Sequence, residues 1–161
     1  MKINKRGFTL MELLIAISII GILASITYPS YRSSVMRSHR ADAQGALASF
    51  ANAMSQWYLQ EDLNCIPAKV HPNNPSYLCA AVGPADTGVP RIFSTTVPIS
   101  GGTPTYNLTI EAATSSTFTL RATPTGSQVG DGYLELTELG VKRWDKNDNG
   151  NIGDEGEALW E

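Results

Sequence analysis

Residues 8–28 form an apolar stretch that constrains this chain more than any other part of its sequence. They read FTLMELLIAISIIGILASITY, with Glu12 as the single charged side chain. As a helix rising about 1.5 Å per residue, the stretch would span the roughly 30 Å of bilayer hydrocarbon. The basic segment 2–6 (KINKR) precedes it and orients such a helix with its N-terminus in the cytoplasm. We therefore expect a transmembrane helix, with everything after Tyr31 on the outer side.

The remainder of the chain excludes several classes of protein. A length of 161 residues suits one domain with a real core. The net charge of −3 and a pI near 5.4 argue against general nucleic-acid binding. His39 has no companion ligand at helical spacing and is expected to be solvated, and the sequence contains no nucleophile elbow and no phosphate-cradling glycine loop. We therefore expect a protein without catalytic activity.

Beyond Pro29 the apolar positions become one-sided. Spacings of four, three, four and three residues separate Ala43, Leu47, Phe50, Met54 and Trp57. Such spacing predicts a helix with one buried stripe, which packs on a sheet more often than on a cofactor. From Phe8 to about Gln60 we expect one long helix.

The second half of the chain alternates apolar and polar residues, as antiparallel strands do. We expect the inward positions to be Tyr106, Leu108 and Ile110; Phe118, Leu120 and Ala122; Leu134 and Leu136; and Leu139 and Val141. Segment 138–140 would turn the last hairpin. The apolar face of this sheet would cover the stripe of the helix.

The N-terminal residues KRGFTLME, from Lys5 to Glu12, resemble the class III signal of type IV prepilins. By this resemblance a prepilin peptidase cuts between Gly7 and Phe8, and the new amine of Phe8 is N-methylated. Glu12 would then pair with the Phe8 amine of a neighbouring subunit and set the register of assembly. The alternative is a first-turn carboxylate that only complements the helix dipole.

Three further segments narrow the resemblance: YPSY at 28–31, ADAQ at 41–44 and GSQVGDG at 126–132. They are similar to the minor pilins grouped with PilE and the DNA-uptake pilin ComP. The resemblance implies the α+β type IV pilin fold, with a long N-terminal α-helix packed on a four-stranded antiparallel sheet. It also implies a minor pilin that co-assembles into type IV pili and supports pilus biogenesis, twitching motility, adhesion or DNA uptake.

Partners and location follow from the same resemblance. The expected partners are other pilins in a filament, the prepilin peptidase, the inner-membrane assembly platform, and the membrane before assembly. The protein would lie in the bacterial inner membrane first and in a cell-surface pilus afterwards. One alternative is a DNA-binding uptake pilin, which we do not favour because only Lys142, Arg143 and Lys146 cluster, beside an acidic tail. The other is a type II secretion pseudopilin, which uses the same leader.

The predicted organisation has four parts. We expect the leader peptide at 1–7, the transmembrane or filament-core half of the helix at 8–31, its amphipathic half at 32–60 and a globular head at 61–161. Within the head we expect a connecting loop at 61–91, the sheet at 92–144 and an acidic C-terminal loop at 145–161.

Gly21 and Pro29 interrupt the apolar helix where pilins carry the same residues. Glycine weakens a helix, and proline removes one of its hydrogen bonds and clashes with the preceding turn. We expect a helix that kinks or locally melts between them, with a mild membrane-helix kink as the alternative.

Cys65 and Cys79 lie in the proline-rich connecting loop at 61–91. A disulfide between them would close a 15-residue ring and stabilise the folded chain by about 3 kcal/mol. We favour a disulfide over two buried thiols. A zinc site is poorly supported, because only His71 accompanies the cysteines.

Related pilins carry a cysteine pair that fixes the last loop, and this chain has none beyond Cys79. In its place the tail reads DKNDNGNIGDEGE from residue 145, and this DxNxNG pattern matches the start of a calcium loop. We expect Ca²⁺ ligands at Asp145, Asn147, Asn149 and Asp154. The twelfth position, where a bidentate Glu belongs, is Gly156. A solvated acidic tail therefore remains the alternative.

Overall fold

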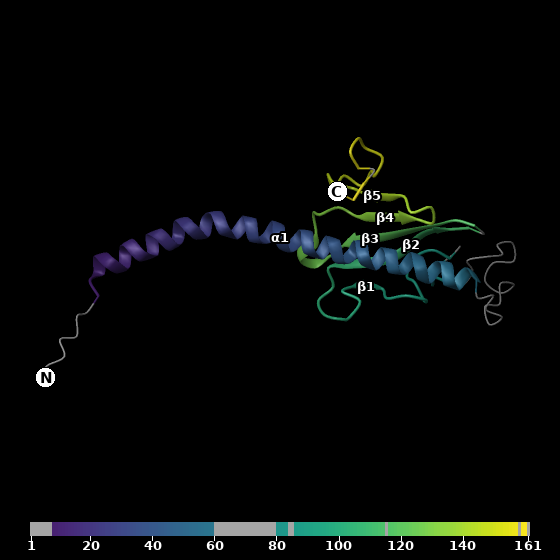
Figure 1. Ribbon diagram of the computed structural model, residues 1–161, viewed down its shortest axis with the longest axis horizontal. Coiled ribbons are helices and arrows are strands. Elements are labelled where there is room, and N and C mark those ends of the chain that lie inside the picture. The colour runs from purple at the N-terminus through teal and green to yellow at the C-terminus, as the bar shows by residue number, and fades with distance from the viewer. Residues whose placement is uncertain (1–7, 60–79, 84–85, 115, 158, 161) are drawn as a thin grey trace. The chain divides into compact units, whose positions relative to one another are not determined.

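The computed structural model describes residues 8–59, 80–83, 86–114, 116–157 and 159–160, without the side chains of 58 and 59. One long helix precedes five strands in the chain (Figure 1). The elements are α1 (Leu10–Leu59), β1 (Thr96–Val97), β2 (Tyr106–Ala113), β3 (Phe118–Pro124), the 3-10 turn η2 (Gly126–Gln128), β4 (Leu134–Thr137) and β5 (Lys142–Trp144). Residues up to Arg37 and residues from Ser38 onward form two separate compact units.

Helix α1 begins at a cap that its own sequence supplies. Thr9 donates to Glu12 through its backbone N–H and its hydroxyl, and the Glu12 N–H donates back to the Thr9 hydroxyl. This reciprocal pattern is a capping box, which satisfies donors that the first helical turn leaves without partners. The helix then continues without interruption through Gly21 and Pro29.

The sheet is an antiparallel meander in which each strand pairs with the next along the chain, in the order β1-β2-β3-β4-β5. The register places Thr96 opposite Asn107, Leu120 opposite Leu136, and Leu134 opposite Trp144. A bulge between Ile110 and Ala112 shifts the register of β2 against β3. The type IV pilin α+β fold is thus confirmed. The sheet has five strands where four were predicted, because β1 is only two residues long and has no alternation to reveal it.

The core of the head lies between the second half of α1 and one face of the sheet, over which that half of the helix runs (Figure 1). The predicted helical stripe is confirmed: Ala43, Leu47, Phe50 and Met54 are fully buried, and Trp57 packs against the core at its edge. The Phe50 ring also stacks on Phe93 at a centroid distance of 5.0 Å. Full burial of each large apolar side chain stabilises the head by about 1.5–3 kcal/mol.

The sheet buries the predicted positions of β2, β3 and β4. The turn predicted at 138–140 is confirmed, but the prediction that Leu139 and Val141 point inward was wrong, since they are 82% and 41% exposed. They belong to the turn between β4 and β5, where the Thr137 N–H donates to the Val141 carbonyl and the Gly140 N–H donates to the Thr137 carbonyl. The last strand, β5, starts at Lys142, the residue after Val141, and its buried residue is Trp144.

Candidate functional site

The first 22 residues of α1 present apolar side chains to the surroundings on every face. Exposure is 86% at Leu10, 64% at Ile20 and 68% at Tyr31, and the most apolar stretch of this helix has no buried share. α1 is also the helix, within the described residues, that is long and apolar enough to cross a membrane. An apolar surface of this extent requires lipid or other protein chains to cover it. We call residues 8–31 the stem.

The acid of the stem takes part in the helix cap. The Thr9 backbone nitrogen and hydroxyl each lie 2.9 Å from Glu12 Oε2. Both bonds from Thr9 therefore end on the same carboxylate oxygen of Glu12. Glu12 therefore acts as a carboxylate of the first helical turn within this chain, as the simpler interpretation expected. The pairing with a neighbouring Phe8 amine stays a prediction.

Packing within this chain does not require glycine at position 21. A Cβ placed on Gly21 would meet nothing within 4 Å. Small residues in apolar helices let neighbouring helices approach closely, and Gly21 leaves such space on the surface of the stem. Pro29 has no N–H to donate to the Ser25 carbonyl. Two side-chain bonds in the preceding turns end on other carbonyls: the Ser25 hydroxyl donates to the Ile22 carbonyl at 2.7 Å, and the Thr27 hydroxyl donates to the Leu23 carbonyl at 2.8 Å.

In the head, a buried polar network centres on Asp131. Its carboxylate accepts from Arg40 Nε at 2.9 Å and from Arg40 Nη2, from the Tyr106 hydroxyl at 2.5 Å and from Gln128 Nε2 at 2.8 Å. Its carbonyl accepts from Trp144 Nε1 at 2.6 Å. Burial, followed by the bond to Asp131, raises the pKa of the Tyr106 hydroxyl above its usual range. The network joins α1, β2, β5 and the segment after β3 at one point.

His39 extends this network, contrary to the prediction that it is solvated. Its side chain is half-buried, and Nδ1 lies 3.3 Å from Gln128 Oε1. Gln128 and Asp131 belong to the family segment 126–132, whereas His39 and Arg40 lie just before the segment at 41–44, and the sequence does not indicate that these two parts of the chain meet. Arg40 and Asp131, which bond to each other, are 91 positions apart in the sequence.

Gly132 allows the backbone just after Asp131 to pass close to the backbone of Asp145. Its φ is +72°, and a Cβ built there would lie 1.7 Å from the Asp145 carbonyl oxygen. No side chain fits at that distance. The turn therefore depends on glycine, and it brings the segment after β3 against the end of β5.

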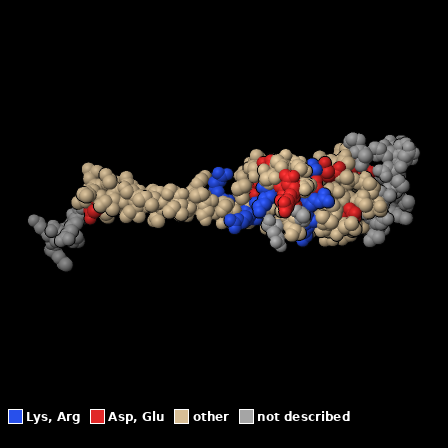
Figure 2. Space-filling model, turned by 90° about the horizontal axis from the view of Figure 1, so that it is seen from above, with Lys and Arg blue, Asp and Glu red and all other residues tan. Residues whose placement is uncertain are grey.

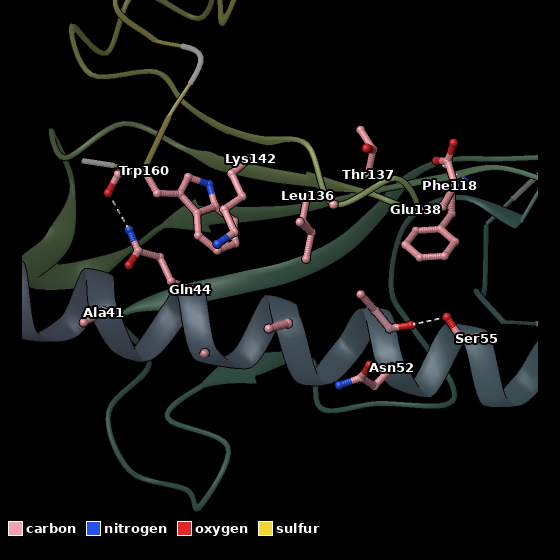
Figure 3. Close-up of a pocket in the computed structure, with 14 residues that line it drawn as sticks. Ala41, Gln44, Asn52, Ser55, Phe118, Leu136, Thr137, Glu138, Lys142 and Trp160 are labelled. Carbon is pink, nitrogen blue, oxygen red and sulfur yellow. Dashed lines mark hydrogen bonds between the residues drawn. The ribbon is translucent and has the colours of Figure 1, made fainter.

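A groove of about 600 Å³ lies between α1 and the β4–β5 hairpin (Figure 3). Its wall on the helix side includes several small residues, among them Gly45 and Ala48. Trp160 closes one end, because Gln44 Nε2 donates to the Trp160 carbonyl at 3.1 Å, and Trp160 Nε1 donates to the Arg143 carbonyl at 2.9 Å. The Lys142 ammonium lies 5.2 Å from the Trp160 ring. The described lining of the groove includes one basic side chain, Lys142, and one acidic side chain, Glu138.

The four predicted calcium ligands lie on one loop after β5. Asp145 is 1% exposed, and its carboxylate accepts the N–H groups of Asn149 at 3.1 Å and Gly150 at 2.9 Å. The side-chain amides of Asn147 and Asn149 reach Asp154 at 3.1 and 2.7 Å. The structure therefore gathers Asn147, Asn149 and Asp154, with Asp145 at the base of the loop.

Sequence reasoning omitted Glu157 from this set. It is 3% exposed, and its Oε1 accepts the Asn147 N–H at 3.3 Å. The sequence did contain a signal for it, because Glu157 stands one position after Gly156, the twelfth position of the expected calcium loop. Within the part of the chain that the structure describes, no three His, Cys, Asp or Glu side chains are gathered closely enough to hold a metal by themselves.

Several predicted sites fall outside the described residues. These are Gly7, on the leader side of the cleavage site, and the predicted disulfide partners Cys65 and Cys79.

The basic side chains of the head are divided between paired and exposed ones. Arg121 contacts Glu111 at 3.1 Å and Glu135 at 2.8 Å, so its charge is compensated. The predicted cluster of Lys142, Arg143 and Lys146 is exposed, on β5 and just after it. Figure 2 shows basic and acidic side chains interleaved over the face of the head that it presents, without one broad basic field.

Comparison with known proteins gives two family matches. Residues 29–136, more than half of the chain, match the family described as type IV minor pilin ComP, DNA uptake sequence receptor. Residues 2–28 match the prokaryotic N-terminal methylation motif.

Similar individual proteins are pilins. Over 54 residues the chain is 44% identical to fimbrial protein EcpC of Eikenella corrodens, covering 34% of this chain and 35% of that one. Over 59 residues it is 39% identical to the type IV major pilin protein PilA of Myxococcus xanthus, covering 37% and 27%. Over 50 residues it is 44% identical to a type IV major alpha-pilin of Moraxella bovis, covering 31% of each. These matches span about a third of the length of the curated relatives.

Proposed function

This chain belongs to the type IV minor pilin ComP family, and from that membership we propose that it is a minor subunit that enters a type IV pilus through its stem. The family is structural, and its members assemble with other pilins in a filament. The methylation motif, together with the exposed apolar helix, indicates membrane anchoring followed by display on the pilus surface.

The observation that carries this proposal is the exposure of the stem. A helix that is apolar on every face is stable in lipid, and it is equally stable among other apolar helices in a filament core. Transfer between these two surroundings changes the hydrophobic free energy little, so close packing and polar pairing must decide the direction. Gly21, beside which the described residues leave open space, and the lone acid Glu12 are suited to those two tasks.

The processing steps follow the leader. We propose that the prepilin peptidase cuts after Gly7, that the amine of Phe8 is methylated, and that the inner-membrane assembly platform extracts the mature chain. The new amine of Phe8 then pairs with Glu12 of a neighbouring subunit. An ionisable group inside an apolar helix calls for such a partner.

Two substitutions at Glu12 separate the roles of cap and charge. Glu12→Gln keeps a side chain that can accept the Thr9 bonds but removes the charge, whereas Glu12→Val removes both. We expect both variants to be inserted and cleaved normally and both to be lost from sheared pili, as measured by immunoblots of pilus and membrane fractions. Normal incorporation of Glu12→Gln would assign the carboxylate to the cap alone, and normal incorporation of both would refute the assembly role.

A second candidate function is DNA binding by the assembled pilin. The family description names a DNA uptake sequence receptor, and the match includes most of the sheet. The cluster of exposed cations in the head consists of Lys142, Arg143 and Lys146. Phosphate contacts make such binding weaken steeply with salt.

The test uses the full chain in detergent with a fluorescent DNA duplex over a range of salt concentrations. Wild-type binding that falls with salt, and is lost in the double variant Lys142→Glu, Arg143→Glu, would support the receptor role. The paired Arg121 provides the control position, since Arg121→Gln leaves the exposed cluster intact. Absence of binding by the wild type would remove DNA as a ligand, and equal binding by all three proteins would show that Lys142 and Arg143 do not form its site. The match to the minor pilin family also favours the pilus over a type II secretion pseudopilin.

A further inference from the structure

The loop Asp145–Glu157 contains two buried carboxylates without a cationic partner. Asp145 is 1% and Glu157 3% exposed. The ion pairs among the described residues join Arg40 to Asp131 and Arg121 to Glu111 and Glu135, so neither loop acid takes part in one. Buried charges are ordinarily paired or coordinate a metal, because desolvation disfavours an isolated one.

Glu157 is the more informative of the two. Its Oε1 accepts the Asn147 N–H at 3.3 Å, which turns the carboxylate toward the third position of the loop. Its Oε2 is buried and has no hydrogen-bond partner among the described residues. A buried carboxylate oxygen with no donor beside it points to a ligand that supplies positive charge.

The other oxygens of the loop lie close to each other. Asp154 Oδ2 is approached by Asn147 Nδ2 at 3.1 Å and Asn149 Nδ2 at 2.7 Å, and its Oδ1 by Asn151 Nδ2 at 2.9 Å. A rotation of an asparagine amide about its last bond exchanges nitrogen for oxygen. For Asn147 and Asn149 the rotation would also break the bonds that their Oδ1 atoms accept from the N–H groups of Asn149 at 3.0 Å and Asn151 at 2.7 Å. With Asn147 and Asn149 so rotated, amide and carboxylate oxygens would converge, and only a cation would stabilise that arrangement.

We propose that this loop binds one calcium ion through the carboxylates of Asp145, Asp154 and Glu157 and the amide oxygens of Asn147 and Asn149. Glu157 is the closing ligand, in the role that the twelfth residue plays in a standard calcium loop. The carboxylates are not gathered closely enough to hold a metal alone, so the ion requires the amide oxygens and draws Asp154 inward.

The donor set selects the ion. It consists of oxygens on a glycine-containing loop, which suits the six to eight ligands and variable geometry of Ca²⁺ better than the strict octahedron of Mg²⁺. Three of the proposed ligands are carboxylates and two are neutral amide oxygens, so the total negative charge around the ion is modest. The expected dissociation constant is therefore about 10⁻⁴–10⁻³ M, the range of extracellular calcium modules.

Binding would also fix the end of the sheet. The Glu157 carbonyl accepts the Trp144 N–H at 3.1 Å, so the closing ligand is attached directly to the edge strand β5. An ion held by Asp145 and Glu157 would pin this edge, in the place where related pilins are expected to carry a disulfide.

The experiment measures calcium binding to the full chain in detergent after treatment with a chelator. Isothermal titration and thermal melting should show saturable binding in the range above and a melting temperature that rises with calcium and not with equal magnesium. Terbium, a luminescent substitute for calcium, should be sensitised by the adjacent Trp144 and displaced by calcium.

Glu157→Gln and Glu155→Gln make a matched pair, because both remove one negative charge from the same loop and Glu155 is exposed. Glu157→Gln should weaken calcium binding at least tenfold, while Glu155→Gln should change it less than twofold. Asp154→Asn, at a half-buried position, should weaken binding as well and serves if Glu157→Gln does not fold. Absence of saturable binding in the wild type, or equal effects of the Glu155 and Glu157 substitutions, would overturn the proposal. Pilus incorporation is not a readout of this experiment, so its result is independent of the assembly proposal.

Discussion

Arg40 on α1 holds the carboxylate of Asp131, which follows β3, with Nε 2.9 Å from Oδ2 and Nη2 bonded to Oδ1. The two side chains are 17% and 4% exposed, and the Arg40 guanidinium also lies 3.7 Å from the centre of the Trp144 ring. One side chain of the helix thus contacts the segment before β4 and the core residue of β5. The docking of α1 on the sheet depends on this contact as well as on the apolar stripe.

Removal of Asp131 should therefore destabilise the head strongly. Asp131→Ala leaves the Arg40 guanidinium, the Tyr106 hydroxyl and the Gln128 amide without their common acceptor. We expect the free energy of unfolding to fall by about 3 kcal/mol or more, as for other broken buried pairs. Denaturant unfolding of the full chain in detergent measures this change. Asp42→Asn, at an exposed position on the same helix, is the control and should change stability by less than about 0.5 kcal/mol.

The Tyr106 hydroxyl should make stability depend on alkaline pH. Burial and the Asp131 bond raise its pKa in the folded state, so the folded protein keeps a proton that the unfolded chain loses. This contribution is fully present below the unfolded pKa of about 10 and is lost as pH rises through the higher folded pKa.

Tyr106→Phe should remove that dependence. The substitution costs roughly 1 kcal/mol at neutral pH, because Asp131 loses one donor. Between pH 9 and 11 the difference in stability between the two proteins should shrink. A constant difference across that range would show that the folded state does not hold the hydroxyl proton.

Gly132 and Gly130 provide a test of backbone geometry. Both have positive φ, but a Cβ on Gly132 would overlap the Asp145 carbonyl oxygen, whereas a Cβ on Gly130 would meet nothing within 4 Å. We expect Gly130→Ala to cost about 1 kcal/mol, from its backbone conformation alone. Gly132→Ala should cost more than about 3 kcal/mol or prevent folding, because overlap adds to strain. Thermal melting compares the two, and equal costs would contradict the close approach at Gly132.

The proposed disulfide has a chemical readout. If Cys65 and Cys79 are joined, the native chain resists alkylation by iodoacetamide until it is reduced, and its mass rises by two hydrogens on reduction. We expect reduction to lower stability by about 3 kcal/mol, and Cys65→Ser to reproduce that loss. Alkylation of the unreduced native chain at both cysteines would exclude the bond.

Sequence patterns predicted the parts of the fold that repeat. The helical stripe from Ala43 to Met54 and the alternating strands from Tyr106 to Leu136 are buried where their periods placed them. Periodicity carries this information because one buried face imposes it over several residues. The two-residue strand β1 is too short to show a period, and Leu139 and Val141 continue an alternation into a turn that ends it.

The candidate sites were predicted less completely, because their residues meet only in the folded chain. The segment 126–132 that contains Asp131 was recognised, and Arg40 lies directly before the recognised segment 41–44, yet the bond between Arg40 and Asp131 depends on the packing of α1 against the sheet. Glu157 was omitted because a standard calcium loop closes one residue earlier. In the structure its side chain turns back to the Asn147 N–H, which only the path of the backbone reveals.

The stem is the basis of the functional account, and peptide mass spectrometry of sheared pili tests it most directly. The account predicts that this chain is present in the pili and that its first peptide begins with N-methylated Phe8, followed by the intact stem. Recovery of the native chain as a freely secreted protein, cut after the stem and missing from the pili, would contradict it.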